Sequence, residues 1–85
     1  MPAQVEFHST VEKRLKRLPK NIQERFWVVV ERLKENPLAG IPLKGDFKGE
    51  RKYRIGDYRI LYRYFSKDKT VFIYQIESRQ GVYKN

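Results

Sequence analysis

The sequence predicts an α+β fold of order β-α-α-β-β-β, an antiparallel sheet with a helical hairpin packed on one face. Two patterns and the loop between them carry this prediction. Apolar residues recur at helical spacing as far as Pro37, and with a period of two from Arg51 onward. Residues 36–50 lie between the two patterns and hold two prolines and three glycines, which predicts a loop. We expect residues 1–85 to form one domain.

The chain is expected to open with a short strand and a short helix. Residues 4–8 alternate apolar with polar side chains and predict the strand. Ser9 and Glu12 have the spacing of a capping box, in which each side chain satisfies a free backbone N–H of the other. Apolar residues at helical spacing then predict a helix over roughly residues 10–18.

A second helix is predicted after Pro19. Asn21 and Glu24 repeat the capping-box spacing. One apolar stripe follows, made of Ile22, Phe26, Val29, Val30 and Leu33. Pro37 should stop this helix near Glu35, because proline disfavours helical backbone in the residue before it. The short link between the helices predicts an antiparallel pair.

Three strands should follow, over about residues 51–55, 57–65 and 70–78. Gly56-Asp57 supplies a tight turn between the first two, since glycine readily adopts positive φ. Residues 66–69, with the sequence SKDK, supply the turn between the last two. The three strands therefore predict an antiparallel meander.

Alternation along these strands predicts one face that meets the helices and one that does not. The helix-side face should carry Arg51, Tyr53, Ile55, Tyr58, Ile60, Tyr62, Tyr64, Phe72, Tyr74 and Ile76. The opposite face should carry Val71 and Ile73 and, grouped on three neighbouring strands, Lys52, Arg54, Arg59 and Arg79. Like charges this close repel one another unless an anion lies among them. The group predicts either an anion-binding face or separate, solvated side chains.

The charge of the whole chain favours a polyanionic partner. Lys and Arg number 19 against 10 Asp and Glu, which gives a net charge of +9. Nucleic acid, an acidic protein and an anionic membrane surface all fit such an excess, and so does a merely charge-rich composition of the thermophilic kind. The chain has no cysteine, so disulfide and thiolate chemistry are excluded. It shows no secretory signal and no apolar run of membrane-spanning length, so we expect a cytoplasmic protein.

The stretch KYRIGDYRILYRY, followed by VFIYQIESRQGVYKN, resembles the RelE/ParE superfamily of bacterial and archaeal toxins. The upstream PLKGDFKG is similar to that superfamily's approach to the first of these strands. The resemblance covers nearly all of the chain and implies the RelE-like form of the predicted fold. Its motifs are much less specific to a branch than to the superfamily.

The resemblance implies one of two activities. The RelE branch cleaves mRNA in the ribosomal A site, and the ParE branch poisons DNA gyrase. Both are neutralised by an antitoxin encoded alongside. The leading interpretation is a ribosome-dependent mRNA endoribonuclease with mRNA, the ribosome A site and a RelB-like antitoxin as partners, without cofactor, metal or membrane. The alternatives are a ParE-like gyrase inhibitor without nuclease chemistry and a catalytically weak, nucleic-acid-binding family member.

Carried over by motif, the catalytic residues implied by the resemblance are Lys52, Arg54, Arg59, Arg79 and Tyr83. Lys52 is the candidate base, because neighbouring cations favour the neutral form of a lysine. Arg54 stands where lysine is common in the family, and it should clamp phosphate since arginine stays protonated. Arg59 would stabilise the transition state, Arg79 would hold the phosphate or assist the leaving group, and Tyr83 would stack on a base or orient the 2′-OH.

Further basic residues complete the predicted RNA-binding set: Lys44, Lys48, Arg51 and Arg63. Other branches of the superfamily use a glutamate base and a histidine, and Ile41 and Ser78 stand near those places here. His8 is expected to be an ordinary surface residue at the end of the first strand. The helix arginines, Arg14, Arg17, Arg25 and Arg32, either meet an acidic antitoxin segment or are only solvated.

Overall fold

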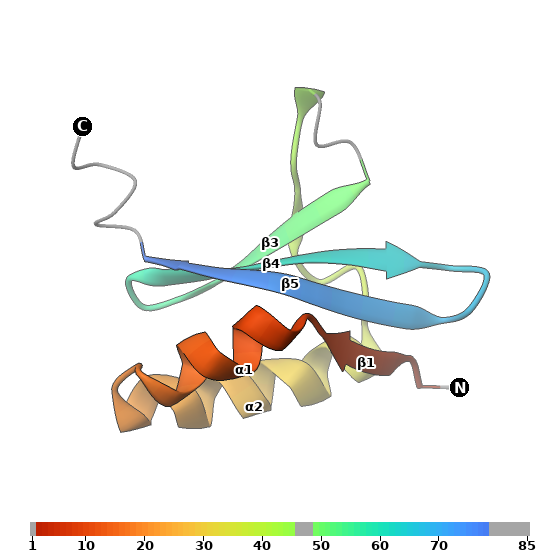
Figure 1. Ribbon diagram of the computed structural model, residues 1–85. Coiled ribbons are helices and arrows are strands. Elements are labelled where there is room, and N and C mark those ends of the chain that lie inside the picture. Colours follow the sequence, from red (N-terminus) through yellow and green to blue (C-terminus); the bar gives the residue numbers. More distant parts are fainter. Residues whose placement is uncertain (1, 46–48, 79–85) are drawn as a thin grey trace.

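Two helices lie along one face of a twisted sheet, and no described part of the chain places a helix on the other face (Figure 1). A computed structural model describes residues 2–45 and 49–78. The elements are β1 (Gln4–Phe7), α1 (Ser9–Lys16), α2 (Lys20–Glu35), β2 (Ile41–Pro42), β3 (Glu50–Ile55), β4 (Tyr58–Phe65) and β5 (Thr70–Ser78). Neither helix is long and apolar enough to cross a membrane. The predicted α+β class is confirmed.

The sheet is mixed, with strand order β1-β5-β4-β3-β2. β3, β4 and β5 form the predicted antiparallel meander. β1 pairs in parallel with β5, because the helical hairpin carries the chain across the face of the sheet between them. β2 is a two-residue edge strand that pairs with β3 inside the stretch predicted to be a loop. Pro42 fits there because an edge strand leaves one side of its backbone unpaired.

Both predicted capping boxes were wrong. His8, not Ser9, caps α1: its Nδ1 accepts from the backbone N–H of Thr10 at 3.2 Å. α2 begins at Lys20 without a side-chain cap, since the carbonyl of Pro19 already accepts from the amides of Ile22 and Gln23. α1 therefore begins one residue earlier than a Ser9 cap would require, and α2 begins two residues earlier than an Asn21 cap would require. His8 is exposed, as expected of a surface residue.

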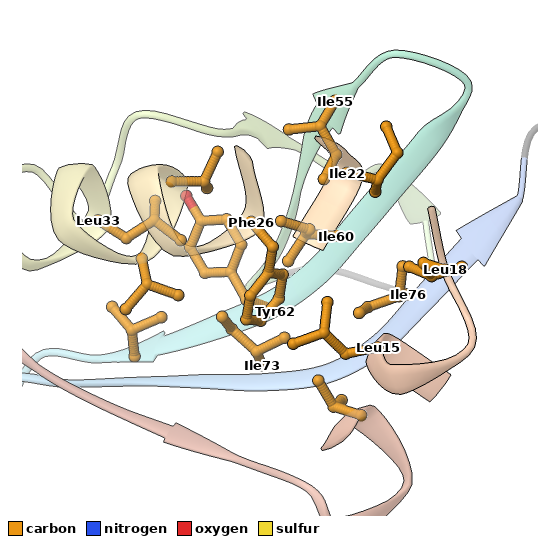
Figure 2. Close-up of a cluster of buried hydrophobic side chains, with 14 of the residues drawn as sticks. Leu15, Leu18, Ile22, Phe26, Leu33, Ile55, Ile60, Tyr62, Ile73 and Ile76 are labelled. Carbon is orange, nitrogen blue, oxygen red and sulfur yellow. The ribbon is translucent and has the colours of Figure 1, made fainter. Parts of the chain in front are cut away.

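The core lies between the helices and the sheet (Figure 2). Its largest fully buried side chains include Tyr62, Phe26, Leu33, Ile60 and Ile73. The helical side supplies the predicted stripe, Ile22, Phe26, Val29, Val30 and Leu33, together with Val11, Leu15 and Leu18. Neither helix packs on the opposite side of β3, β4 and β5, and we call that side the outer face.

A β-bulge corrects the predicted faces of β5. Leu61 pairs with Gln75 but Tyr62 pairs with Ile73, so Tyr74 is an extra residue without a partner in β4. The extra residue reverses which side chains of β5 face the core in the part of the strand that precedes the bulge. Val71 and Ile73 therefore lie in the core, with 0% exposure, although they were predicted to face outward. Phe72 and Tyr74 were wrongly predicted to face the helices, whereas Ile76, beyond the bulge, is buried as predicted.

Candidate functional site

Cross-strand pairing gathers the predicted strand cations on the outer face. Arg54 lies opposite Arg59, and Lys52 lies opposite Leu61, two pairs along the same two strands and so on the same face. A pocket of about 420 Å³ opens beside them. Its lining is Leu43, Glu50, Lys52, Arg59, Leu61, Tyr74, Gln75 and Glu77, and we call it the outer-face pocket. Lys52 and Arg59 are thus brought to one cavity by neighbouring strands.

Arg59 is held by an ion pair across two strands. Its register partner in β5 is Glu77, and Nη2 of Arg59 donates to Oε1 of Glu77 at 2.8 Å. Gln75 donates to the second oxygen, Oε2, at 3.1 Å. Nε of Arg59 is buried and has no hydrogen-bond partner among residues 2–45 and 49–78. One guanidinium edge is therefore fixed by a carboxylate, while other N–H groups remain to bind an anion.

Glu50 and Tyr74 form a second pair in the outer-face pocket. The Tyr74 hydroxyl donates a short hydrogen bond to Oε1 of Glu50. Burial raises the pKa of Tyr74, and the hydrogen bond to the Glu50 carboxylate raises it further. The phenol therefore stays protonated and keeps donating, so Glu50 is held in place as an acceptor.

Three further cations predicted for the site, Arg54, Arg63 and Lys44, lie near the pocket but do not line it. Arg54 is exposed beside Arg59 on β3. Arg63 is exposed on the same face, and its guanidinium carbon lies 5.6 Å from the centre of the Phe65 ring. Lys44 is exposed just beyond β2. These positions suit contacts with a phosphate chain that enters or leaves the pocket.

Arg51 lies on the helix-side face and is engaged within the protein. Its Nη1 donates to the carbonyl of Gly40 at 2.8 Å and to that of Leu38 at 3.3 Å. The structure therefore gives this predicted RNA contact a role in holding the loop before β2. Lys48, Arg79 and Tyr83, also predicted for the site, lie outside the described residues.

Neither Ile41 nor Ser78, which stand near the places where other branches carry a glutamate and a histidine, can act as an acid or base. Ile41 is 63% exposed on β2, opposite Lys52. Ser78 ends β5 opposite Tyr58, on the helix-side face. Whatever proton transfer occurs at the outer-face pocket must use its own Lys52, Glu50, Tyr74 or Glu77, or residues outside the described ranges.

Sequence reasoning missed Glu50, Tyr74 and Glu77 as pocket residues. Glu50 shares the alternation of Lys52 and Arg54, so a strand begun one residue earlier would have placed it on the same face. Glu77 shares the alternation of Arg79, which was predicted for the outer face, but its pairing with Arg59 depends on the register. Tyr74 was missed because the bulge has no evident signal in an apolar strand.

The fold and the outer-face pocket together define a small, basic protein of the RelE-like α+β class. The chain belongs to the family described as ParE toxin of type II toxin-antitoxin system, parDE, which matches residues 5–83. The resemblance to the RelE/ParE superfamily is thereby confirmed, and with it the assignment to type II toxins.

Relatives and solved structures agree with this family. A protein of Methanocaldococcus jannaschii that carries the name RelE1 is 37% identical over 90 residues, or 100% of this chain and 99% of the relative. Toxin RelG of Mycobacterium tuberculosis is 35% identical over 89 residues, or 99% of each. A chain in the crystal structure of the Mycobacterium tuberculosis RelBE2 toxin-antitoxin complex matches with a TM-score of 0.84 and 32% identity, covering 93% of this chain and 100% of that one.

Proposed function

We propose that this toxin is a ribosome-dependent mRNA endoribonuclease, and that residues 1–85 act as one toxin domain. The observation that carries the proposal is the convergence of Lys52 and Arg59 on one pocket in the outer face of the sheet. A cavity with two cations from neighbouring strands suits a phosphate flanked by two nucleotides. A RelE-named relative over the full chain supports the same branch.

The reaction we propose needs no metal. The 2′-oxygen attacks the adjacent phosphorus while the bond from phosphorus to the 5′-oxygen breaks, which leaves a 2′,3′-cyclic phosphate and a 5′-OH. A base must take the 2′-OH proton, cations must stabilise the charged phosphorane, and an acid must protonate the leaving oxygen. We assign Lys52 as the base and Arg59 as the stabilising cation, because both line the pocket.

The other predicted residues keep their proposed roles around this centre. Arg54, Arg63, Lys44 and Lys48 would contact the phosphate chain, Arg79 the scissile phosphate or leaving group, and Tyr83 a base or the 2′-OH. Arg54 and Arg63 are exposed on the outer face, which supports a role beside the pocket rather than in it.

We also propose that a cognate RelB-like antitoxin binds this chain. The similar Mycobacterium tuberculosis chain comes from a toxin-antitoxin complex. A net charge of +9 favours an acidic partner segment. A toxin that acts on translating ribosomes would work in the cytoplasm.

The deciding experiment is induction of the chain in cells, followed by mapping of mRNA ends and of DNA breaks. The proposal predicts cuts within codons of translated messages, and cuts in a purified system only when ribosomes are present. Intact mRNA accompanied by gyrase-linked DNA breaks would reject it in favour of a ParE-like gyrase inhibitor. Intact mRNA without DNA breaks would identify a catalytically weak family member.

A further inference from the structure

One carboxylate of the outer-face pocket, Glu50, forms no ion pair within residues 2–45 and 49–78, although Arg63 is its register partner in β4. Oε1 of Glu50 accepts from Tyr74, while Oε2 makes no hydrogen bond with residues 2–45 and 49–78. Glu77, the other carboxylate of the pocket, is engaged at both oxygens by Arg59 and Gln75. Glu50 is therefore the acceptor that a ligand in this pocket would meet.

An anionic side chain inside a phosphate-binding site works against the binding of RNA. Carboxylate and phosphate repel each other, and the pocket is partly shielded from water, so the repulsion is not fully screened. A carboxylate becomes favourable for RNA where it receives a donor, either the ribose 2′-OH or the N–H groups of a nucleobase, and only a base edge offers two such donors side by side. We therefore expect the Glu50 carboxylate to bind the edge of a nucleobase rather than the phosphate backbone of the RNA.

The rest of the lining suits a flat, partly apolar group. Leu61 is only 9% exposed, and Leu43 is half-buried beside it. Together with Glu50 they give the pocket an apolar surface next to a charged acceptor. The volume of about 420 Å³ lies within the ~300–1,000 Å³ usual for ligand sites, and single-stranded RNA is typically recognised by bases that leave the stack.

We propose that the outer-face pocket receives one unstacked base of the RNA substrate and that Glu50 makes it selective for guanine. This inference rests on the proposed function, since it takes RNA to be the substrate. Tyr74 acts as a positioning residue, because its hydroxyl fixes one oxygen of Glu50 and leaves the other for the base.

Guanine is the base that matches a carboxylate. Its Watson–Crick edge presents the N1–H and the 2-amino group side by side, two donors for the two oxygens of one carboxylate. Oε1 of Glu50 retains a second lone pair beyond the one used by Tyr74. Adenine and cytosine each place a ring-nitrogen acceptor beside their amino group, and uracil flanks its N–H with carbonyls, so each would bring a repelling lone pair towards Glu50.

The test compares guanosine with inosine, which lacks only the 2-amino group. Full-length protein is titrated with fluorescent 2′-O-methyl RNA pentamers that carry either nucleoside at each position in turn. The modification blocks cleavage, so affinity alone is measured. We expect inosine to weaken binding about tenfold at one position, which corresponds to ~1.4 kcal/mol. The substitution Glu50→Gln should reduce that ratio to about twofold or less.

Glu24→Gln is the matched control, since Glu24 is exposed on α2 and the substitution removes the same charge. It should keep the tenfold ratio. Glutamine at position 50 still accepts from Tyr74, so circular dichroism should report an unchanged fold. Equal affinity for the two pentamers at every position, no binding of either, or an unchanged ratio in Glu50→Gln would each overturn the proposal. Guanosine preference without ribosome-dependent cleavage would support the pocket and reject the endoribonuclease.

Discussion

The hydroxyl of Tyr62 is hydrogen-bonded to the backbone of Gly40, and this contact ties the loop before β2 to the centre of the sheet. The Gly40 N–H donates to the Tyr62 hydroxyl at 2.8 Å, and the hydroxyl donates to the carbonyl of Pro37 at 2.8 Å. The Tyr62 ring lies in the core with 0% exposure (Figure 2). The same loop leads to Leu43 in the outer-face pocket. One buried phenol therefore helps to position a wall of the site.

Tyr62→Phe should destabilise the protein by about 1–3 kcal/mol. The substitution keeps the ring but leaves the buried Gly40 N–H and the Pro37 carbonyl without their partner, and an unsatisfied buried group costs its desolvation. Urea unfolding measures the loss. Tyr64→Phe is the control, since the Tyr64 hydroxyl makes no hydrogen bond within the described part of the chain. Equal unfolding midpoints for the two variants would show that the contact contributes nothing.

Gly40→Ala should destabilise more than Gly45→Ala. A Cβ at position 40 would lie 2.6 Å from the Tyr62 hydroxyl oxygen and 2.7 Å from the Lys52 carbonyl oxygen, so either the loop or β3 must move. At Gly45 a Cβ meets nothing within 4 Å, and only its φ of +72° makes alanine unfavourable, by about 1–2 kcal/mol. We expect Gly40→Ala to cost at least about 1 kcal/mol more in urea unfolding. The reverse order of stability would contradict the close approach.

The raised pKa of Tyr74 predicts a loss of stability in alkaline solution. Below pH ~10 the phenol is protonated in both the folded and the unfolded chain, so it adds no pH dependence. Above that, the unfolded chain releases the proton while the folded chain retains it, and stability falls until folded Tyr74 ionises. The urea midpoint of the wild type should therefore fall more steeply between about pH 9 and 11 than that of Tyr74→Phe.

Comparing slopes isolates Tyr74. Burial also raises the pKa of Tyr62, but Tyr62 is present in both proteins and its contribution cancels. Lysines that titrate in the same range cancel likewise. Parallel slopes for the two proteins would mean that the Tyr74 phenol ionises as in the unfolded chain.

The periodicity of the sequence was sufficient to predict the layers of the fold, because each periodic pattern lies within one helix or one strand. The stripe of α2 and the Gly56-Asp57 turn were both predicted where the structure has them. The parallel pairing of β1 with β5 joins segments from opposite ends of the chain, and no local pattern encodes it. β2 was missed because a two-residue edge strand with a proline carries almost no alternation.

The site was predicted less completely because it depends on register. Val71 and Ile73 are as apolar as Phe72 and Tyr74, so either alternation of β5 gave a plausible buried face. The bulge at Tyr74 decided between them and placed a phenol in the pocket. The cations of the site could be identified from the motif and from the alternation along each strand. The carboxylate that pairs with Arg59 could not, because Glu77 is identified only once the register of β4 and β5 is known.

Lys52→Ala should reduce ribosome-dependent mRNA cleavage by at least about 10²-fold, the usual contribution of a general base. Lys52 is half-buried on the surface of the sheet, so the free energy of unfolding should change by no more than ~0.5 kcal/mol. Primer extension on a single translated message measures the cleavage. Lys67→Ala removes an equal charge from the exposed turn between β4 and β5 and should keep full activity. Full activity of Lys52→Ala would remove Lys52 from the mechanism.

Arg59→Lys tests whether charge alone suffices at the centre of the pocket. Arg59 holds Glu77 through Nη2 while its buried Nε remains unpartnered in the described part of the chain, and only a planar guanidinium presents N–H groups in two directions at once. A lysine ammonium keeps the positive charge but cannot contact Glu77 and the phosphate at the same time. We therefore expect cleavage to fall by about 10²-fold or more in kcat, since the lost contact is stronger in the transition state.

The matched control is Arg54→Lys, because Arg54 lies opposite Arg59 but is exposed and does not line the pocket. It should lose less than about threefold in kcat, because lysine supplies the same charge to a phosphate held from outside. Equal losses in the two variants would mean that the outer face acts through its total charge. A loss confined to Arg59→Lys would show that the guanidinium held by Glu77 is the group that meets the transition state.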